Sequence, residues 1–309
     1  MAEMKGDNVL KPMNRTDQRS GGTGADLPAL LPRRRHVLLA GMAAALTAGT
    51  AWAELADIRE RGSLKVALYR NHQPFSDGGS QGVSGADAAL AKALADRLRL
   101  GVQWLPFEAG ENLGDDLRNM VWRGHYLGYG PADLMMQVPI DRHLIAQTRQ
   151  VEFLMPYYRH RLVWLTRGEP SRAELRSMAL DGLTLAAETG TAAAGALLGY
   201  GSGRFRGAVR LSSTGLDAAR GVLTGKWQAA YVTQAQAEFV LKDVPGAGDY
   251  LIEPAALPGT PPNGWVVGLA IKSGQPMLAQ VLREAMGPLL EDGTVSRIWR
   301  EHGLTLLGP

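Results

Sequence analysis

The order of apolar and polar positions predicts strands and helices that alternate along most of the chain. Residues 63–68 (SLKVAL) alternate as a strand does, and a glycine-rich loop follows them. Residues 86–98 carry apolar side chains at helical spacing, and residues 102–106 predict a second strand. A strand, a helix and a strand in this order predict a βαβ unit and therefore a parallel sheet.

The same alternation continues to the C-terminus and predicts two lobes. We expect further strands at 132–138, 161–166, 182–187, 227–232 and 265–271, and helices at 115–122, 192–198, 214–223, 235–241, 277–290 and 295–302. The predicted fold class is α/β with two lobes, each a mixed, mostly parallel sheet flanked by helices. Residues 54–162 and 265–309 form the first lobe, and residues 163–264 form a second lobe inserted into it.

The N-terminal region predicts an export signal. Residues 33–53 (RRRHVLLAGMAAALTAGTAWA) place basic residues before an apolar run that ends in small residues. Arg34 and Arg35 predict the twin-arginine type, and Ala51 and Ala53 form the A-x-A pattern that predicts cleavage after about Ala53. An uncleaved anchor is the alternative, but the apolar run is shorter than the roughly 20 residues of a spanning helix. Residues 1–32 indicate a long leader or a mis-assigned start, and the mature protein is expected in the periplasm.

The composition of the predicted mature chain excludes several function classes. Residues 1–53 hold seven of the 33 Lys and Arg and four of the 30 Asp and Glu, which leaves 26 of each sign. A neutral chain without a basic patch argues against nucleic-acid binding. The absence of cysteine excludes thiol catalysis and thiolate metal sites.

No motif in the chain indicates catalysis or a cofactor. The sequence contains no H-E-x-x-H, no P-loop and no dinucleotide fingerprint. His125, Tyr126, Tyr129 and His143 are interpreted as parts of a loop and a polar turn, because no further ligand falls at metal-binding spacing. We therefore predict a protein that is not an enzyme and that needs neither metal nor cofactor.

Four groups of segments, in chain order, give the sequence a family resemblance. They are residues 64–77 with 85–98; 132–142 to 155–158; 188–195 with 225–239; and 266–299. Together these segments resemble the family 3 solute-binding proteins, which are extracellular components of polar amino-acid ABC transporters. The resemblance implies a type II periplasmic binding protein whose two lobes close over a ligand by hinge motion.

The resemblance also implies where a ligand binds. Phe75 matches an aromatic residue that stacks on the ligand, and Arg142 matches the arginine that grips an amino acid's carboxylate. Gly190 and Thr191 match a turn whose amides complete that anion site. Thr233 stands where the family has an aspartate that pairs with the α-ammonium group. A hydroxyl cannot supply that charge, so the departure argues against an ordinary α-amino acid.

These observations favour a monomeric solute-binding protein that captures a small polar or anionic solute, amino-acid-like or a carboxylate, for an ABC transporter permease. A looser resemblance covers residues 121–159 and suggests an alternative. It points to the binding-protein homologues that accompany periplasmic quinoprotein alcohol (methanol) dehydrogenases, with residues 122–131 as the contact. A third possibility is a lyase on the same scaffold, for which Glu188 is the candidate acid or base.

Overall fold

The computed structural model describes residues 55–79, 82–168 and 170–309. The predicted export signal, with Arg34, Arg35, Ala51 and Ala53, lies outside these residues. Within the described part of the chain, no helix combines the length and the apolar character needed to cross a membrane.

The first sheet has five strands in the order β4-β1-β5-β12-β6. Their bounds are Gly101–Phe107 for β4, Ser63–Tyr69 for β1, Leu134–Pro139 for β5, Trp265–Lys272 for β12 and Val151–His160 for β6. Strand β1 is parallel to both β4 and β5, whereas β12 is antiparallel to its two neighbours. Helix α2 (Ala86–Arg97) connects β1 to the parallel strand β4, so the predicted βαβ unit is confirmed.

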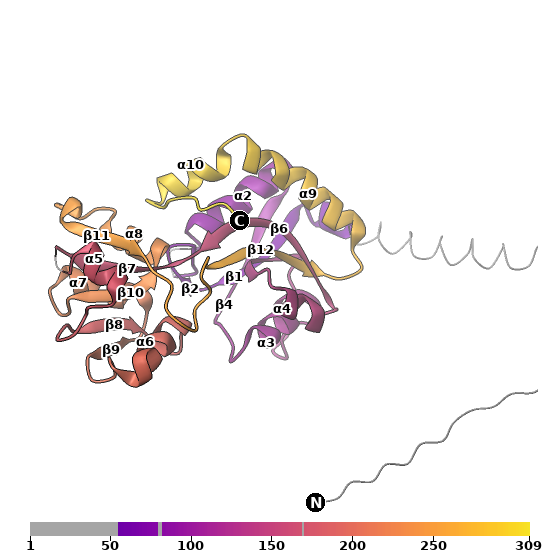
Figure 1. Ribbon diagram of the computed structural model, residues 1–309. Coiled ribbons are helices and arrows are strands. Elements are labelled where there is room, and N and C mark those ends of the chain that lie inside the picture. Colours follow the sequence, from indigo (N-terminus) through magenta and orange to yellow (C-terminus); the bar gives the residue numbers. More distant parts are fainter. Residues whose placement is uncertain (1–54, 80–81, 169) are drawn as a thin grey trace, which may run out of the picture. The chain divides into compact units, whose positions relative to one another are not determined.

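Both faces of the first sheet are covered, which explains why its strands are apolar at successive positions. Helices α2, α9 (Pro276–Glu291) and α10 (Thr294–Glu301) pack on one face, as Figure 1 shows. Val66 and Met136 point to that face, while their chain neighbours Ala67 and Met135 belong to the core on the other. Helix α3 (Leu113–Leu117) and the π-helix η1 (Arg118–Trp122) cover the second face, where one continuous helix was predicted.

The second sheet also has five strands, in the order β11-β7-β10-β8-β9. Their bounds are Tyr250–Pro254 for β11, Leu162–Arg167 for β7, Ala229–Thr233 for β10, Leu185–Glu188 for β8 and Val209–Ser212 for β9. Strands β10, β8 and β9 are parallel, and β7 is antiparallel to its two neighbours β10 and β11, so β7 alone among the five runs in the opposite direction. The two sheets, each mixed and flanked by helices, confirm the predicted fold class.

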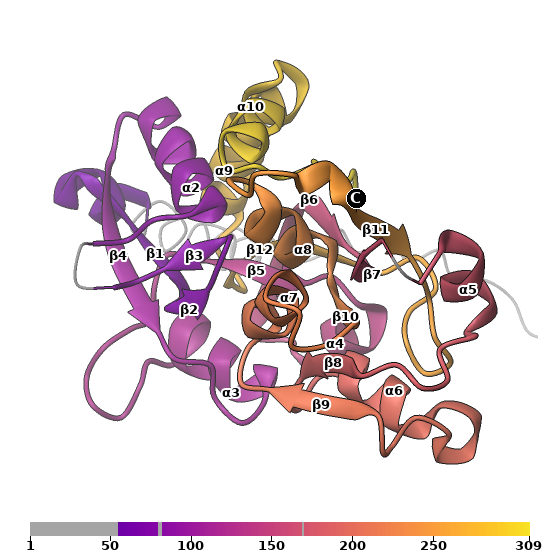
Figure 2. The same ribbon diagram turned by 90° about the vertical axis from the view of Figure 1, so that its left-hand side faces the viewer.

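Helices cover both faces of the second sheet as well. Helix α7 (Gly215–Leu223) and helix α8 (Gln234–Leu241) pack on the face that carries Val163 and Val232. Helix α5 (Arg172–Ser177) and helix α6 (Ala192–Gly203) pack on the opposite face, and Figure 2 shows α7 and α6 on either side of β8 and β10. Short elements complete the structure: β2 (Asn71–His72), β3 (Ser76–Asp77), α4 (Arg142–Gln147) and the 3-10 turn η2 (Ala247–Asp249).

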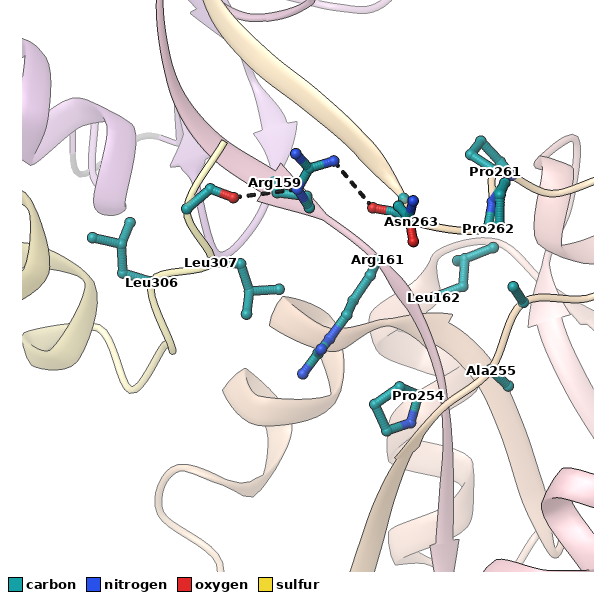
Figure 3. A pocket seen from close by; sticks show the side chains of 13 residues that line it. Arg159, Arg161, Leu162, Pro254, Ala255, Pro261, Pro262, Asn263, Leu306 and Leu307 are labelled. Carbon is teal, nitrogen blue, oxygen red and sulfur yellow. Dashed lines mark hydrogen bonds between the residues drawn. The ribbon is translucent and has the colours of Figure 1, made fainter.

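Two crossings connect the sheets. The chain leaves the first sheet after β6, at Arg161, and returns at Gly264, just before β12. A cavity of about 590 Å³ lies beside the crossings (Figure 3). On its wall, the Arg159 guanidinium donates hydrogen bonds to the carbonyl oxygens of Asn263 and Gly308, each at 3.2 Å. These contacts tie the outgoing strand, the returning strand and the C-terminal segment together.

Gly264 allows the two crossing strands to approach each other. Its φ of +69° lies in the left-handed region, and a Cβ there would lie 1.7 Å from the carbonyl oxygen of His160. Only a residue without a side chain fits this contact. The glycine therefore determines the geometry of the crossing.

We predict that Gly264→Ala strongly destabilises the protein, by more than about 2 kcal/mol, because backbone atoms must move to relieve the clash. Gly274→Ala is the matched control. Its φ of +86° is equally unusual, but no atom lies within 4 Å of the added Cβ. Equal losses of unfolding free energy in the two variants, measured by chemical denaturation, would contradict the argument.

Candidate functional site

Two adjoining cavities form a cleft between the two sheets. Their volumes are about 410 and 270 Å³, and they share His72, Thr233, Gln236 and Trp265 as common walls. Thr233 and Gln236 belong to the second sheet and its helix α8, whereas Trp265 opens strand β12 of the first sheet. We call the two cavities together the inter-sheet cleft.

Strand ends supply most of the side chains in the cleft. Glu188 ends β8 and Thr233 ends β10, which are parallel neighbours in the second sheet. His72 lies in the hairpin that follows β1 of the first sheet. Ligands of α/β proteins bind outside the carboxyl ends of parallel strands, because side chains from several strands converge there.

Four aromatic rings form the wall contributed by the first lobe. The rings of His160 and Trp265 are stacked, with centroids 5.0 Å apart and an interplanar angle of 11°. Phe75 meets the His160 ring edge to face at 4.9 Å and stacks on His72 at 5.5 Å. Burial lowers the pKa of His72 to about 4 and that of His160 to about 3, so both imidazoles are neutral at pH 7.

A buried chain of hydrogen bonds supports this wall from behind. His160 is 3% exposed, and its Nε2 lies 2.9 Å from Oε1 of Gln137. The backbone N–H of Gln137 donates to the Tyr157 hydroxyl, which in turn donates to Oδ1 of Asp87 at 3.0 Å. Asp87 is fully buried in the first turn of α2, and this burial raises its pKa to about 7.

The second lobe contributes a linked group of polar side chains. The Glu188 carboxylate accepts hydrogen bonds from the backbone N–H of Gly215 at 2.9 Å and from Nε2 of Gln236 at 3.4 Å. Gln236 and Thr233 form a capping box at the start of α8, in which the Thr233 hydroxyl accepts from the Gln236 N–H. Partial burial raises the pKa of Glu188, and the hydrogen bonds from Gly215 and Gln236 oppose that rise.

Formal charge is scarce in the cleft. Among the described residues that line its two cavities, Glu188 has the only carboxyl group, and none is a lysine or an arginine. A neighbouring groove shares Glu188 and Gln236 and adds Asp77, Asp217 and Arg220. Arg220 lies 3.5 Å from Asp217, so acidic groups outnumber basic ones around the cleft.

Three of the five predicted ligand-binding residues line the cleft, and two do not. Phe75, Thr191 and Thr233 line the cleft, although Phe75 is almost fully buried behind the two histidines. The Thr191 hydroxyl donates to the carbonyl of Glu188 and accepts from the N–H of Ala194, so it caps helix α6. The Thr233 hydroxyl accepts a hydrogen bond from the Gln236 N–H, so its own O–H can still donate to a ligand.

Arg142 and Gly190 both lie at exposed positions outside the lining of the cleft. Arg142 is exposed in the first turn of α4, and Gly190 is exposed with a φ of +77° in the turn before α6. Neither belongs to the lining of the two cavities described above. Their assignment to an anion site therefore stays a prediction.

The sequence did not single out several residues of the cleft. His72, His160, Gln137, Gln236 and Trp265 were missed as candidates. A signal existed for Gln236, because Thr-x-x-Gln after a predicted strand is the signature of a capping box. The two histidines lie 88 positions apart and meet only through the pairing of strands, so no local pattern could join them.

No protein-family model and no curated protein matches the sequence, but solved structures do. One is described as an ancestral cationic amino acid solute-binding protein, with 21% identity and a TM-score of 0.64 over 81% of this chain and 99% of that one. Another structure is described as an ancestral amino acid-binding protein that is a precursor of cyclohexadienyl dehydratase (20%, TM-score 0.56, 81% and 99%). A third is the substrate-binding protein of a polar amino acid ABC uptake transporter from Streptococcus thermophilus (16%, TM-score 0.62, 82% and 90%).

At these identities the similarity establishes the fold. The chain folds as a two-lobed periplasmic binding protein. The similar structures described above include no partner of a quinoprotein dehydrogenase, so that resemblance stays a prediction.

The loop proposed for such a partner has an ordered arrangement in this two-lobed structure. The His125 ring stacks on Tyr129 at 4.2 Å and contacts Tyr126 at 4.3 Å. Tyr126 is 88% exposed and Leu127 is 67% exposed. His125 and His143 are not brought into a metal site, since no group of three or more potential ligands lies together among the described residues.

The buried carboxyl group behind the aromatic wall predicts a pH effect. The pKa of Asp87 rises from 3.8 to about 7 on folding, so the folded state retains a proton that the unfolded state loses between those values. The stability contributed by this group therefore falls as the pH rises from about 4 to about 7. Asp87→Asn removes the charge and should gain up to about 4 kcal/mol relative to the natural protein between pH 4 and pH 8.

Chemical denaturation of Asp87→Asn and of the natural protein at pH 4 and pH 8 measures this gain in unfolding free energy. The contributions of the buried histidines are the same in both proteins and cancel in the comparison. Asp96→Asn, on the exposed side of the same helix, should show no such gain. A difference between Asp87→Asn and the natural protein that does not change with pH would contradict the assignment.

Proposed function

We propose that this protein is an extracytoplasmic solute-binding protein that captures a small molecule in the inter-sheet cleft for an ABC transporter. One observation carries the proposal: the walls of the cleft come from both lobes, with Glu188 and Thr233 on one side and His72 and Trp265 on the other. A ligand that contacts both walls favours the closed arrangement, and a membrane transporter can distinguish this state from the open one.

Three further observations support this function. The similar structures carry names that describe amino acid-binding proteins, one of them belonging to an ABC uptake transporter. The predicted export signal places the mature chain on the side of the membrane where such proteins work. The cleft volumes suit a molecule of about amino-acid size.

The proposal includes binding without chemical conversion. Glu188 is the group through which a lyase would act, and it lies in the cleft. Its carboxylate is held by Gly215 and Gln236 in an arrangement suited to fixing a ligand. Mass spectrometry of compounds incubated with the protein should recover them unchanged.

We predict that a panel of amino acids, carboxylates and amines contains a compound that raises the melting temperature by about 5–10 °C at 100 times its Kd. The same compound should reduce the radius of gyration in small-angle scattering, because closure brings the lobes together. Trp265→Ala should weaken binding tenfold or more, since Trp265 lines both cavities.

Trp104→Ala serves as the matched control. Trp104 lies on β4, outside the cleft lining, so this variant should lose stability without losing affinity. Arg142→Ala tests the predicted anion contact in the same assay. If no compound in the panel changes the melting temperature, the proposed function is wrong.

A further inference from the structure

We infer that the inter-sheet cleft selects an organic amine, a ligand with an apolar or aromatic body and one ammonium group bound by Glu188, and without a carboxylate. This inference rests on the proposed function and specifies its ligand. It follows from the charges, the apolar walls and the hydrogen bonds of the cleft.

Glu188 is placed to bind a cation. It lines the cleft at the end of β8 and is half-buried, so its carboxylate faces a site that is partly removed from water. The hydrogen bonds that it accepts from Gly215 and Gln236 both reach Oε2. Oε1 thus keeps its capacity to accept from a ligand. An ammonium group that leaves water needs such a carboxylate, because a neutral acceptor does not offset its lost hydration.

Glu188 supplies the negative charge that Thr233 lacks in place of the aspartate expected at that position. Thr233 replaces the aspartate that the resemblance leads one to expect, and it contributes a hydroxyl at the end of β10. The adjacent parallel strand β8 ends in a carboxylate instead. Gln236 connects the two positions, since its amide oxygen accepts from the Thr233 N–H and its amide nitrogen donates to Glu188. The negative charge is therefore present in the same cleft but on a different strand.

The described lining of the cleft provides no positively charged side chain to balance a ligand carboxylate. The described lining of both cavities contains no lysine or arginine, and the two histidines are neutral. The first turn of α6 lines the cavity that also holds Glu188. An anion at that helix end would share the cavity with a carboxylate and would lack a cationic partner. The neighbouring acidic groups Asp77 and Asp217 add to the repulsion.

The remaining walls suit an apolar body. Trp265, Phe75, Leu162, Tyr231 and Val232 all line the cavities, and Trp265 reaches both of them. Aromatic rings bury large apolar areas and attract cations over their faces. A flat aromatic or branched apolar group attached to the ammonium is thus the expected shape.

Four compounds that share one aromatic body test the inference by calorimetry. They are 2-phenylethylamine, phenylalanine, 3-phenylpropanoate and 2-phenylethanol, which differ in amine and carboxylate groups. We expect 2-phenylethylamine to bind at least tenfold more tightly than the other three. Its affinity should also fall as the pH is lowered and Glu188 takes up a proton.

Glu188→Gln keeps an acceptor for the Gly215 N–H but removes the charge. It should weaken binding of 2-phenylethylamine at least tenfold and leave that of 2-phenylethanol unchanged, which a merely misfolded cleft would not do. Asp217→Asn, which alters an acidic residue outside the two cavities, should leave the affinity within about twofold.

The possible outcomes distinguish failure of the amine inference from failure of the proposed solute-binding function. Tighter binding of phenylalanine or 3-phenylpropanoate than of 2-phenylethylamine overturns the inference and leaves a solute-binding function. Equal binding of the amine by Glu188→Gln and the natural protein also overturns it. If neither these compounds nor the wider panel binds, both the inference and the proposed function fail.

Discussion

The close approach of Gly264 to the carbonyl of His160 is the constraint on which the functional part of the structure depends. The two residues belong to the segments that cross between the sheets: His160 is part of the aromatic wall of the cleft, and Gly264 directly precedes Trp265 of the same wall. His160 is the last residue of β6 and Trp265 is the first residue of β12. Because the backbones meet at this point, the two rings stack at 5.0 Å. The crossing that connects the lobes therefore also builds the aromatic wall between them.

The buried aromatic wall determines which groups of the cleft carry a charge. Burial keeps His72 and His160 neutral, since a charged imidazole would lose its hydration without gaining a carboxylate partner. Gln137 satisfies one nitrogen of His160 without charge. Electrostatic selection is thereby left to the opposite lobe, where Glu188 projects from a strand end. The first lobe supplies the aromatic wall, and the second lobe supplies the charge together with further apolar side chains.

Much of the fold could be predicted from the sequence, because buried strands and amphipathic helices leave a periodic pattern. The alternation at β1, the apolar run at β12 and the long helices were each predicted close to their observed positions. Strands β9 and β11 were missed, since they have four and five residues and little alternation. Strand β6 was not predicted as a strand of its own either, although it has 10 residues. Helix α5 was also missed, although Ser171 and Glu174 form a capping box at its start.

The cleft was less predictable for a different physical reason. Residues such as Thr191 and Thr233 sit at the junction of a strand and a helix, which the chain order reveals. His72 and His160 line the cleft only because strands far apart in the sequence pair with each other. The identity of these two side chains does not predict that pairing. The exposed position of Arg142 depends on the short helix α4, which was not predicted. A sequence motif predicts which residue could contact a ligand. Whether its side chain reaches the pocket depends on the conformation of the neighbouring turns.

Glu188 also links ligand charge to lobe closure. Burial raises its pKa, which means that the surrounding protein disfavours the ionised carboxylate. A bound ammonium group removes that penalty, and it does so most fully when the first lobe excludes water from the pair. Since His72 and Trp265 lie on that lobe, the same closure buries the apolar body of the ligand. The electrostatic and hydrophobic contributions therefore favour one arrangement of the lobes together, and a ligand that has only one of these features would favour closure less.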